Sequence, residues 1–237
     1  MKFVNNAPAI LHKKALIIGD THFGMEDKLR ERGIFDEQFS LRIFEKIKRL
    51  ITETKAEKLI ILGDVKERIT VLDARTADIL AKLSLLVELI IVRGNHDGGI
   101  EGCGAKIIPS DGFVFNKLGL VHGQSWPSNE CMQAEYLVCA HQHPQLSIVD
   151  RSGKRHSEPV WIIAEPDEEK IKEKYKKFNK KIKLVLMPAF NPLVGAPFVP
   201  SDEHLGPITS NNLFKINAAT VFRLDGTLLG GLEKIKG

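Results

Sequence analysis

The sequence predicts an α/β fold, with a parallel sheet in the first half of the chain and short strands in the second. Residues 13–20, 58–64 and 85–92 are typical of strands, because each is a short apolar run followed at once by polar residues. Two amphipathic segments separate these runs. Strands that alternate with helices build parallel sheets, so the order strand, helix, strand, helix, strand indicates this class.

The two segments between the strands have the periodicity of helices. Residues 37–53 place apolar side chains such as Ile43 and Ile47 four positions apart along an otherwise charged segment. Residues 70–84 repeat this spacing toward Leu83. We therefore expect one helix in each segment, with its apolar face against the sheet.

The second half of the chain, after about residue 104, has a different texture. Short apolar segments follow one another, among them FVFN, LGLVHG, EYLVCAH, PVWIIAE, KLVLMP and ATVFRL, and they predict strands. We expect a short helix before Tyr136 and a charged helix over residues 166–179. Residues 191–212 are rich in Pro, Gly and Asn, which predicts a long loop of the kind that is often functional. Without a repeat or a low-complexity linker, residues 1–237 are expected to form one domain.

The charge of the chain is concentrated in one segment. The net charge is +4, and residues 168–183 alone carry eight Lys and three Glu, a local balance of +5. The remainder is therefore close to −1. Such a run is usually the solvated face of a helix, and the alternative is a grip on a phosphate backbone.

Cysteine usage and the N-terminal segment both indicate a cytoplasmic protein. The cysteines are three in number and show no CxxC spacing, which favours a reducing compartment. The N-terminus has no sustained apolar run of the kind found in a signal peptide. No stretch approaches the roughly 20 apolar residues of a membrane span, so we expect no membrane partner.

Polar residues follow several of the predicted strands. In the first half they are Asp20, His22, Asp64, Asn95, His96 and Asp97. Two later segments end in His122 and in the pair His141 and His143. In a parallel sheet, ligands bind outside the carboxyl ends of the strands, so these side chains are expected to gather at one rim. Two His at positions i and i+2 of an extended segment point to the same face.

These residues form a set of oxygen and nitrogen ligands without sulfur. The set suits Mn²⁺, with Fe or Zn²⁺ as alternatives. It is too large for one ion and fits two, and a pair of ions roughly 3.5–4 Å apart can clamp a phosphoryl group. His96 is a candidate proton or hydrogen-bond donor to a leaving oxygen. Taken singly, Asp20 and Asp64 could also be helix caps or turn residues. His122, taken singly, could be a buried structural histidine.

As an ordered set, the motifs D-x-H, G-D, G-N-H-D, a lone His after a strand and H-x-H resemble the calcineurin-like metallophosphoesterase superfamily. The resemblance implies a four-layer α/β/β/α sandwich, in which two mixed sheets have flanking helices. It also implies roles for the residues. Asp20, His22 and His143 would hold one metal ion, Asn95, His122 and His141 the other, and Asp64 would bridge both. His96 would face the substrate, with Asp97 hydrogen-bonded behind it.

Finer motifs resemble one branch of that superfamily. GDTHFG is similar to the SbcD-type DNA nucleases, and AHQHP with LVLMPAFNPLVGAPF is similar to small SbcD-related archaeal phosphoesterases and to the ligase-associated DNA-repair endonuclease. This implies hydrolysis of phosphodiester bonds in single-stranded or flapped DNA, with a helicase or ligase as partner. Asn191 is the candidate substrate contact, and packing of its loop is the alternative.

The sequence departs from the family pattern at two places. Ala140 stands before H-x-H where Gly is usual, and a His expected in the archaeal branch near Glu67 is missing. We also expect no large DNA-capping region of the kind found in the SbcD nucleases. Two further functions remain open on the sequence: a small-molecule or cyclic-nucleotide phosphoesterase, and a non-catalytic metal-bound scaffold.

Overall fold

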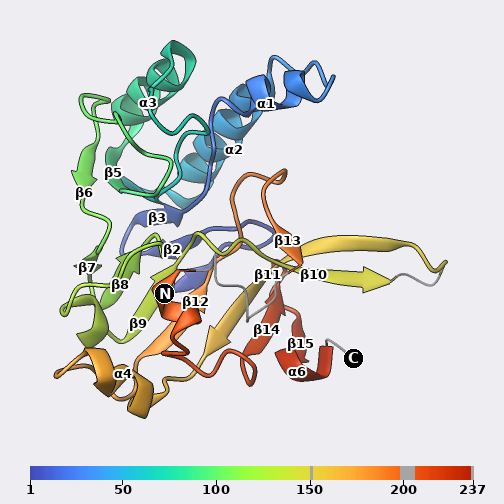
Figure 1. Ribbon diagram of the computed structural model, residues 1–237. Coiled ribbons are helices and arrows are strands. Elements are labelled where there is room, and N and C mark those ends of the chain that lie inside the picture. Colours follow the sequence, from blue (N-terminus) through green and yellow to red (C-terminus); the bar gives the residue numbers. More distant parts are fainter. Residues whose placement is uncertain (150–151, 198–205, 236–237) are drawn as a thin grey trace.

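The computed structural model describes residues 1–149, 152–197 and 206–235 (Figure 1). The strands in the N-terminal half are β1 (Lys2–Phe3), β2 (Ile10–His12), β3 (Ala15–Ile18), β4 (Lys58–Leu62), β5 (Glu88–Val92) and β6 (Lys106–Ile108). The later strands are β7 (Phe113–Phe115), β8 (Leu118–Val121), β9 (Tyr136–Cys139), β10 (Pro144–Val149), β11 (Arg155–Ala164), β12 (Lys183–Leu186), β13 (Ala196–Pro197), β14 (Thr220–Arg223) and β15 (Leu228–Gly231). The helices are α1 (Met25–Glu31), α2 (Phe39–Thr54), α3 (Ala74–Leu86), the 3-10 helix η1 (Cys131–Gln133), α4 (Glu168–Lys174), α5 (Pro207–Ser210) and α6 (Leu232–Ile235).

These elements form two mixed sheets with flanking helices, as the resemblance to the calcineurin-like family implies. In the described residues the first sheet has the order β1-β2-β3-β4-β5-β6, and its strands from β3 to β6 are parallel. The second sheet has the path β13-β10-β11-β12-β9-β8-β7, and β14 and β15 extend it from β11. Its strands β8, β9 and β12 are parallel neighbours. In Figure 1, α1, α2 and α3 lie beyond the first sheet, and α4 and α6 lie beyond the second.

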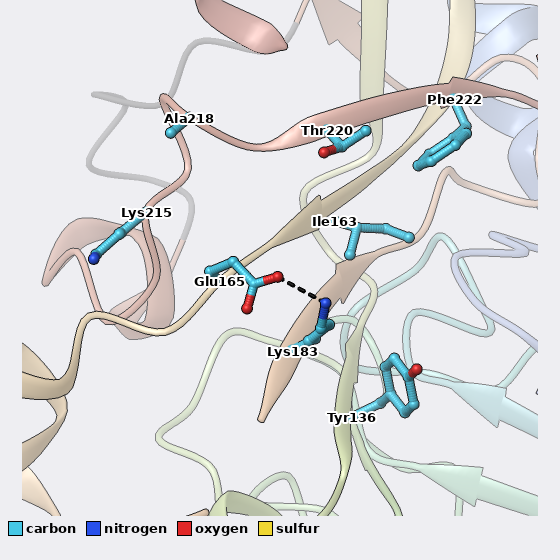
Figure 2. A pocket seen from close by; sticks show the side chains of 8 residues that line it. All are labelled: Tyr136, Ile163, Glu165, Lys183, Lys215, Ala218, Thr220 and Phe222. Atoms are coloured by element: carbon cyan, nitrogen blue, oxygen red, sulfur yellow. Dashed lines mark ion pairs between the residues drawn. The ribbon is translucent and has the colours of Figure 1, made fainter. Parts of the chain in front are cut away.

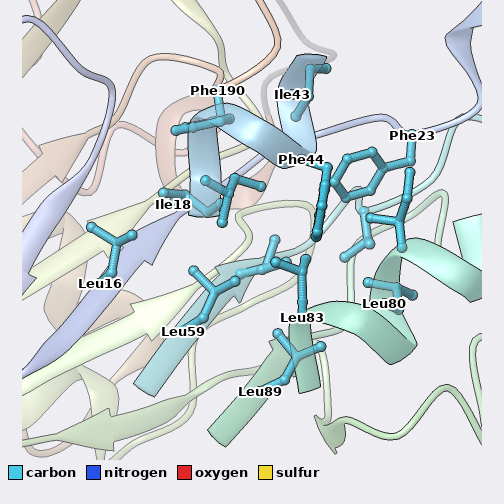
Figure 3. Close-up of a cluster of buried hydrophobic side chains, with 14 of the residues drawn as sticks. Leu16, Ile18, Phe23, Ile43, Phe44, Leu59, Leu80, Leu83, Leu89 and Phe190 are labelled. Carbon is cyan, nitrogen blue, oxygen red and sulfur yellow. The ribbon is translucent and has the colours of Figure 1, made fainter. Parts of the chain in front are cut away.

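Side chains that alternate in direction along the parallel strands form two apolar layers, one on each face of the first sheet. In β4, Leu59 and Ile61 belong to the apolar cluster under α2 and α3, while Ile60 and Leu62 belong to the cluster between the sheets. Figure 3 shows Leu59 in the first of these clusters, together with Phe44 from α2. Successive side chains of a strand point to opposite faces, so strands buried on both faces need the continuous apolar runs seen in the sequence.

The second sheet repeats this division. In β9, Leu137 packs in the outer cluster and Val138 in the cluster between the sheets. In β12, Leu184 and Val185 divide in the same way. The two sheets therefore share one apolar layer, and each has a second core on its outer face.

The end of α3 differs from the sequence prediction. The helix begins after Asp73, whose side chain accepts a hydrogen bond from the Thr76 amide, and it continues through Leu86. We predicted that Leu85 opens the third strand. Instead Leu85 is 86% exposed on the helix, and β5 begins at Glu88. An apolar run does not show by itself where a helix gives way to a buried strand.

The charged helix is shorter than predicted. α4 spans only Glu168–Lys174, and Tyr175 is extended. The Tyr175 ring is buried in the outer core of the second sheet, and its hydroxyl donates to the Pro127 carbonyl at 2.7 Å. Turning this ring inward ends the helix.

Some segments escaped the sequence analysis. The N-terminal pair β1 and β2 and the helix α1 were not predicted. The expected loop over residues 191–212 contains β13 and α5, and its residues 198–205 lie outside the described part of the chain. No helix in the described residues is both long and apolar enough to cross a membrane.

Leu59 tests the contribution of the first core. We expect Leu59→Ala to lower the free energy of unfolding by about 3 kcal/mol, because it leaves a cavity among side chains that are fully buried. The control is Leu85→Ala, which removes the same atoms from an exposed position. Urea denaturation measures both variants, and equal stability losses would contradict this account of the core.

Candidate metal centre

The predicted site residues lie where the two sheets meet at their carboxyl ends. Asp20 and His22 follow β3, Asp64 follows β4, His122 follows β8 and His141 follows β9. The backbone amide of His141 donates to the Asp20 carboxylate at 3.2 Å, which ties the second sheet to the first. The rim expected from the sequence is therefore formed.

Five of these residues adopt a left-handed backbone conformation. They are Asp20 (φ 55°), His22 (φ 43°), Asp64 (φ 47°), His141 (φ 66°) and His143 (φ 42°). This conformation is uncommon outside glycine, and Asp and His are among the residue types that tolerate it. Each such residue costs roughly 1 to 3 kcal/mol, and strain of this kind gathers at functional sites.

The first group of candidate ligands is Asp20, His22 and His143, whose ligand atoms all lie within 4.8 Å of one another. His143 Nε2 is 3.1 Å from Asp20 Oδ1. His22 donates its Nδ1–H to Glu67 Oε2 at 2.9 Å, which leaves Nε2 as the free ligand atom. The Nε2 atom of His22 is buried and has no hydrogen-bond partner in the described part of the chain.

The second group centres on His122. Its Nδ1–H donates to the Leu62 carbonyl at 2.7 Å, so Nε2 carries the lone pair. Three ligand-type atoms face this nitrogen: Asn95 Oδ1 at 3.1 Å, His141 Nδ1 at 3.1 Å and Asp64 Oδ1 at 3.4 Å. Atoms of partial negative charge crowd together here, so a proton or a cation must lie between them.

Asp64 stands between the two groups. Its Oδ1 faces His122 Nε2 at 3.4 Å, and its Oδ2 faces His22 Nε2 at 3.7 Å. The carboxylate is buried, and the backbone amide of His96 also donates to Oδ1 at 2.9 Å. One carboxylate thus presents an oxygen to each group.

The electrostatics of the metal-free centre favour positive charge. Burial raises the pKa of the Asp20 carboxyl, but the opposite effect of His143 and His122 is larger, so the pKa lies below its usual value. Burial also raises the pKa of Asp64, and again His122 and His22 outweigh it. Burial lowers the pKa of His122, yet Asp64 and Asp20 raise it to about 9. Burial and the neighbouring His122 lower the pKa of His141 to about 4.

These observations fit a divalent cation. The donors are carboxylate, amide and imidazole atoms, the histidine lone pairs face inward, and two buried carboxylates need compensation by charge. In the metal-free chain His122 supplies part of that charge as an imidazolium. Its raised pKa means that this contribution is complete below pH ~6.5 and is lost as pH rises through about 9.

His96 and Asp97 are arranged differently from the expectation. Both oxygens of Asp97 accept hydrogen bonds at 2.8 Å from backbone amides, one from Val65 and one from Gly94. His96 Nδ1–H donates to the Glu67 carbonyl at 2.8 Å. The pairing of Asp97 with His96 is therefore wrong, because the Asp97 carboxylate is bound by the Gly94 amide of the same turn and by the Val65 amide that follows β4. Asp97 holds the turn, and His96 remains partly exposed beside His22.

Asn191 is not placed for substrate contact. It is fully buried, its Nδ2 donates to the Thr21 carbonyl at 3.1 Å, and its Oδ1 accepts from the Leu193 amide. Its backbone amide donates to the Asp20 carbonyl. The alternative from the sequence, packing of the loop, is the arrangement found, and Asn191 supports the segment that carries Asp20 and His22.

Ala140 is tolerated where the family usually has Gly. It is absent from the residues with positive φ in the described chain. Its methyl group faces Gly19, and a Cβ added at Gly19 would lie 2.7 Å from it. Gly19, at the end of β3, therefore leaves the space that the Ala140 methyl group at the end of β9 occupies.

Sequence reasoning missed Lys66 and Glu67. Lys66 is fully buried, and its Nζ donates to the carbonyls of Arg68, Ile69 and His96. Glu67 lies within reach of His22 and His96 as a third group of possible ligands. Their nearness to Asp64 in sequence was the available signal, and nothing in the residue types alone showed where they point.

The lysine-rich segment lies away from the metal centre. Lys183 pairs in register with Tyr136 at the amino ends of β12 and β9, whereas His141 follows the carboxyl end of β9. Glu168 forms ion pairs with Lys172 and Lys180. The position of the lysines and their ion pairs favour a solvated helix face over a contact with substrate phosphates at the metal centre.

A hollow of about 460 Å³ lies at this same far end. Figure 2 shows Tyr136, Ile163 and Phe222 along it, with the ion pair between Glu165 and Lys183 at 2.7 Å. None of the predicted site residues lines this hollow.

The fold and this centre define a metal-dependent hydrolase of phosphoester bonds. Residues 13–220 match the family model of the calcineurin-like phosphoesterases, and the chain belongs to this family. No match was found among curated protein sequences.

Two solved structures are similar to this chain to different degrees. The nuclease MPE of Pseudomonas putida has a TM-score of 0.56 at 17% identity, over 91% of this chain and 86% of that chain. The phosphoesterase Yfce of E. coli has a TM-score of 0.44 at 17% identity, over 91% of this chain and 96% of that chain. The likeness to MPE shows the shared fold.

Gly94 tests how tightly the centre is packed. A Cβ added there would lie 2.3 Å from both the backbone nitrogen and Oδ1 of Asp64, so Gly94→Ala must displace this carboxylate. We expect a loss of about 3 kcal/mol in the free energy of unfolding and weaker binding of Mn²⁺.

Gly231→Ala is the control for this variant, because nothing lies within 4 Å of the added Cβ. Its stability should stay within about 0.5 kcal/mol of the wild type. Urea denaturation without metal and a titration with Mn²⁺ measure both effects. Wild-type behaviour of Gly94→Ala would refute the close contact.

Proposed function

We propose that this protein is a dinuclear metal-dependent phosphodiesterase that acts on nucleic acid, with Mn²⁺ as the preferred ion. The observation that carries the dinuclear part is the position of Asp64, which presents one oxygen to the His22 group and the other to the His122 group. Each group has further ligand-type atoms of its own within 4.8 Å. One ion could not contact all of them at ordinary ligand distances.

The chain's own residues supply binding and proton transfer. When bound, two divalent cations neutralise phosphoryl oxygens and lower the pKa of an attacking water. His96 Nδ1–H is held by the Glu67 carbonyl, so the ring presents its Nε2 edge. In the imidazolium form, Nε2–H can give its proton to the leaving oxygen as the phosphorus–oxygen bond breaks.

A polymeric substrate is supported by the position of the centre. Asn95 is exposed, and His96, His141 and His143 are partly exposed, so the centre meets solvent at the rim of the sheets. The motifs shared with DNA-processing phosphoesterases and the nuclease named among the structural neighbours point to the same substrate class. We therefore propose single-stranded or flapped DNA as the substrate.

The proposal includes a cytosolic location. Cys103, Cys131 and Cys139 are all buried and form no disulfide, which suits a reducing compartment.

One experiment tests the substrate class. The purified protein is incubated with Mn²⁺ and, separately, bis-p-nitrophenyl phosphate, a cyclic nucleotide, and labelled single-stranded and flapped DNA. We expect hydrolysis of the model diester and of DNA. Hydrolysis of the cyclic nucleotide without cleavage of DNA would show that the substrate is a small molecule, and no hydrolysis with two bound ions would indicate a scaffold.

Asp64→Asn tests the bridge. The neutral amide is a weaker ligand than a carboxylate, so we expect the metal content to fall from two ions per chain to one or none, with at least a roughly 100-fold loss of kcat/KM. Asp78→Asn is the control, because Asp78 is an exposed carboxylate paired with Lys82 on α3. Elemental analysis after gel filtration gives the ion count, and two full sites in Asp64→Asn would contradict the bridging role.

His96→Ala tests the proton donor. We expect kcat to fall by about 10² to 10⁴ with metal content unchanged, because the ring acts on the leaving oxygen. His156→Ala is the matched control at an exposed histidine. Near-normal turnover of His96→Ala on the model diester would show that this role is wrong.

A further inference from the structure

Glu67 contacts two histidines of the site through different parts of its structure. Its side chain accepts a hydrogen bond from His22 Nδ1–H at 2.9 Å, and its backbone carbonyl accepts one from His96 Nδ1–H at 2.8 Å. The two imidazole rings lie 5.1 Å apart and are nearly perpendicular, at 76°. One residue thus fixes a candidate ligand and the candidate proton donor relative to each other.

We propose that Glu67 is a positioning residue, which holds His22 with Nε2 directed at the first cation and sets the affinity of that cation. This inference rests on the proposed dinuclear function, since it concerns one of the two ions. Glu67 belongs to none of the five motifs that the sequence analysis identified.

The contact fixes the tautomer of His22. A proton held at Nδ1 by a carboxylate leaves the lone pair on Nε2, which is the atom that faces Asp64 Oδ2 at 3.7 Å. A carboxylate behind a metal-binding histidine also fixes the ring orientation and makes the ligand nitrogen more basic. Nε2 of His22 is buried without a hydrogen-bond partner in the described residues, so this orientation leaves it available to an ion.

The Glu67 carboxylate is itself held in place. Its Oε1 accepts from Lys28 Nζ at 2.8 Å, while Oε2 serves His22. The Glu67 side chain is only 13% exposed, whereas Lys28 is 47% exposed. Hydrogen bonds therefore connect the surface at α1 to the metal centre, from Lys28 through Glu67 to His22.

The backbone at Glu67 is fixed separately. Its amide donates to the Phe23 carbonyl at 2.8 Å, which links it to the segment that carries His22. The neighbouring Lys66 binds the His96 carbonyl at 2.7 Å. A change of the Glu67 side chain thus leaves the carbonyl contact to His96 in place, and the two roles can be separated by experiment.

The test compares Glu67→Met with Glu67→Gln. Met fills a similar volume without an acceptor, and Gln keeps an acceptor oxygen. We expect Glu67→Met to weaken one of the two Mn²⁺ binding steps by about 10- to 100-fold, and Glu67→Gln to recover most of this loss. Titration calorimetry of the metal-free proteins gives both dissociation constants. At saturating Mn²⁺, kcat for bis-p-nitrophenyl phosphate should fall far less than in His96→Ala.

Glu101→Ala is the matched control, because Glu101 is an exposed carboxylate that pairs with Arg93 beside the G-N-H-D turn. Its two dissociation constants should equal those of the wild type. Lys28→Met should weaken the same step by at most about fivefold, since a partly exposed ion pair contributes little.

A second measurement needs no variant. In wild-type protein loaded with Zn²⁺, nitrogen NMR should show His22 protonated at Nδ1 and unprotonated at Nε2. A proton on Nε2 would overturn the inference, and so would unchanged Mn²⁺ binding in Glu67→Met. A wild type that binds only one ion would instead refute the dinuclear proposal, so the two failures are distinguishable.

Discussion

The structure of the site depends on the burial of two carboxylates, Asp20 and Asp64, at the junction of two sheets. Buried carboxylates are unfavourable unless positive charge lies beside them. Here His22, His122 and His143 surround them, and the lone pairs of His22 and His122 face inward because Glu67 and the Leu62 carbonyl hold their other nitrogens. The same arrangement that compensates the carboxylates by protonation in the free chain provides the ligands for divalent cations.

The sheets supply the convergence at a cost in backbone strain. Parallel strands bring β3, β4 and β5 to one rim, and β8 and β9 reach the same place from the second sheet. Each strand must then turn sharply so that a short side chain points back over the rim. Left-handed backbone at Asp20, Asp64 and His141 achieves this turn. The apolar layers on both faces of the sheets provide the stability that tolerates such strain.

Support for the site comes mostly from backbone contacts. Asp97 accepts hydrogen bonds from the amides of Val65 and Gly94, and Asn191 donates to the Thr21 carbonyl in the segment that follows Asp20. Lys66 donates to three backbone carbonyls, one of them that of His96. None of these side chains needs to touch a substrate to matter for the reaction. They hold the loops after the strands rigid, which catalytic geometry requires. Glu67 differs from them because its side chain acts directly on a candidate ligand.

The sequence by itself determined where the parallel strands β3, β4 and β5 end, the ligand types and their order, since each strand ends where an apolar run such as LIIL meets polar residues. The family model of the calcineurin-like phosphoesterases matches residues 13–220, which agrees with that prediction. Only the tertiary structure decided which partner each polar atom takes. Asp97 binds the backbone amides of Val65 and Gly94 in place of His96, Asn191 is buried, and Glu67 contacts His22. Such hydrogen-bond partners depend on the direction of loop side chains. Local periodicity fixes the faces of helices and strands, but it carries no information about the direction of a loop side chain.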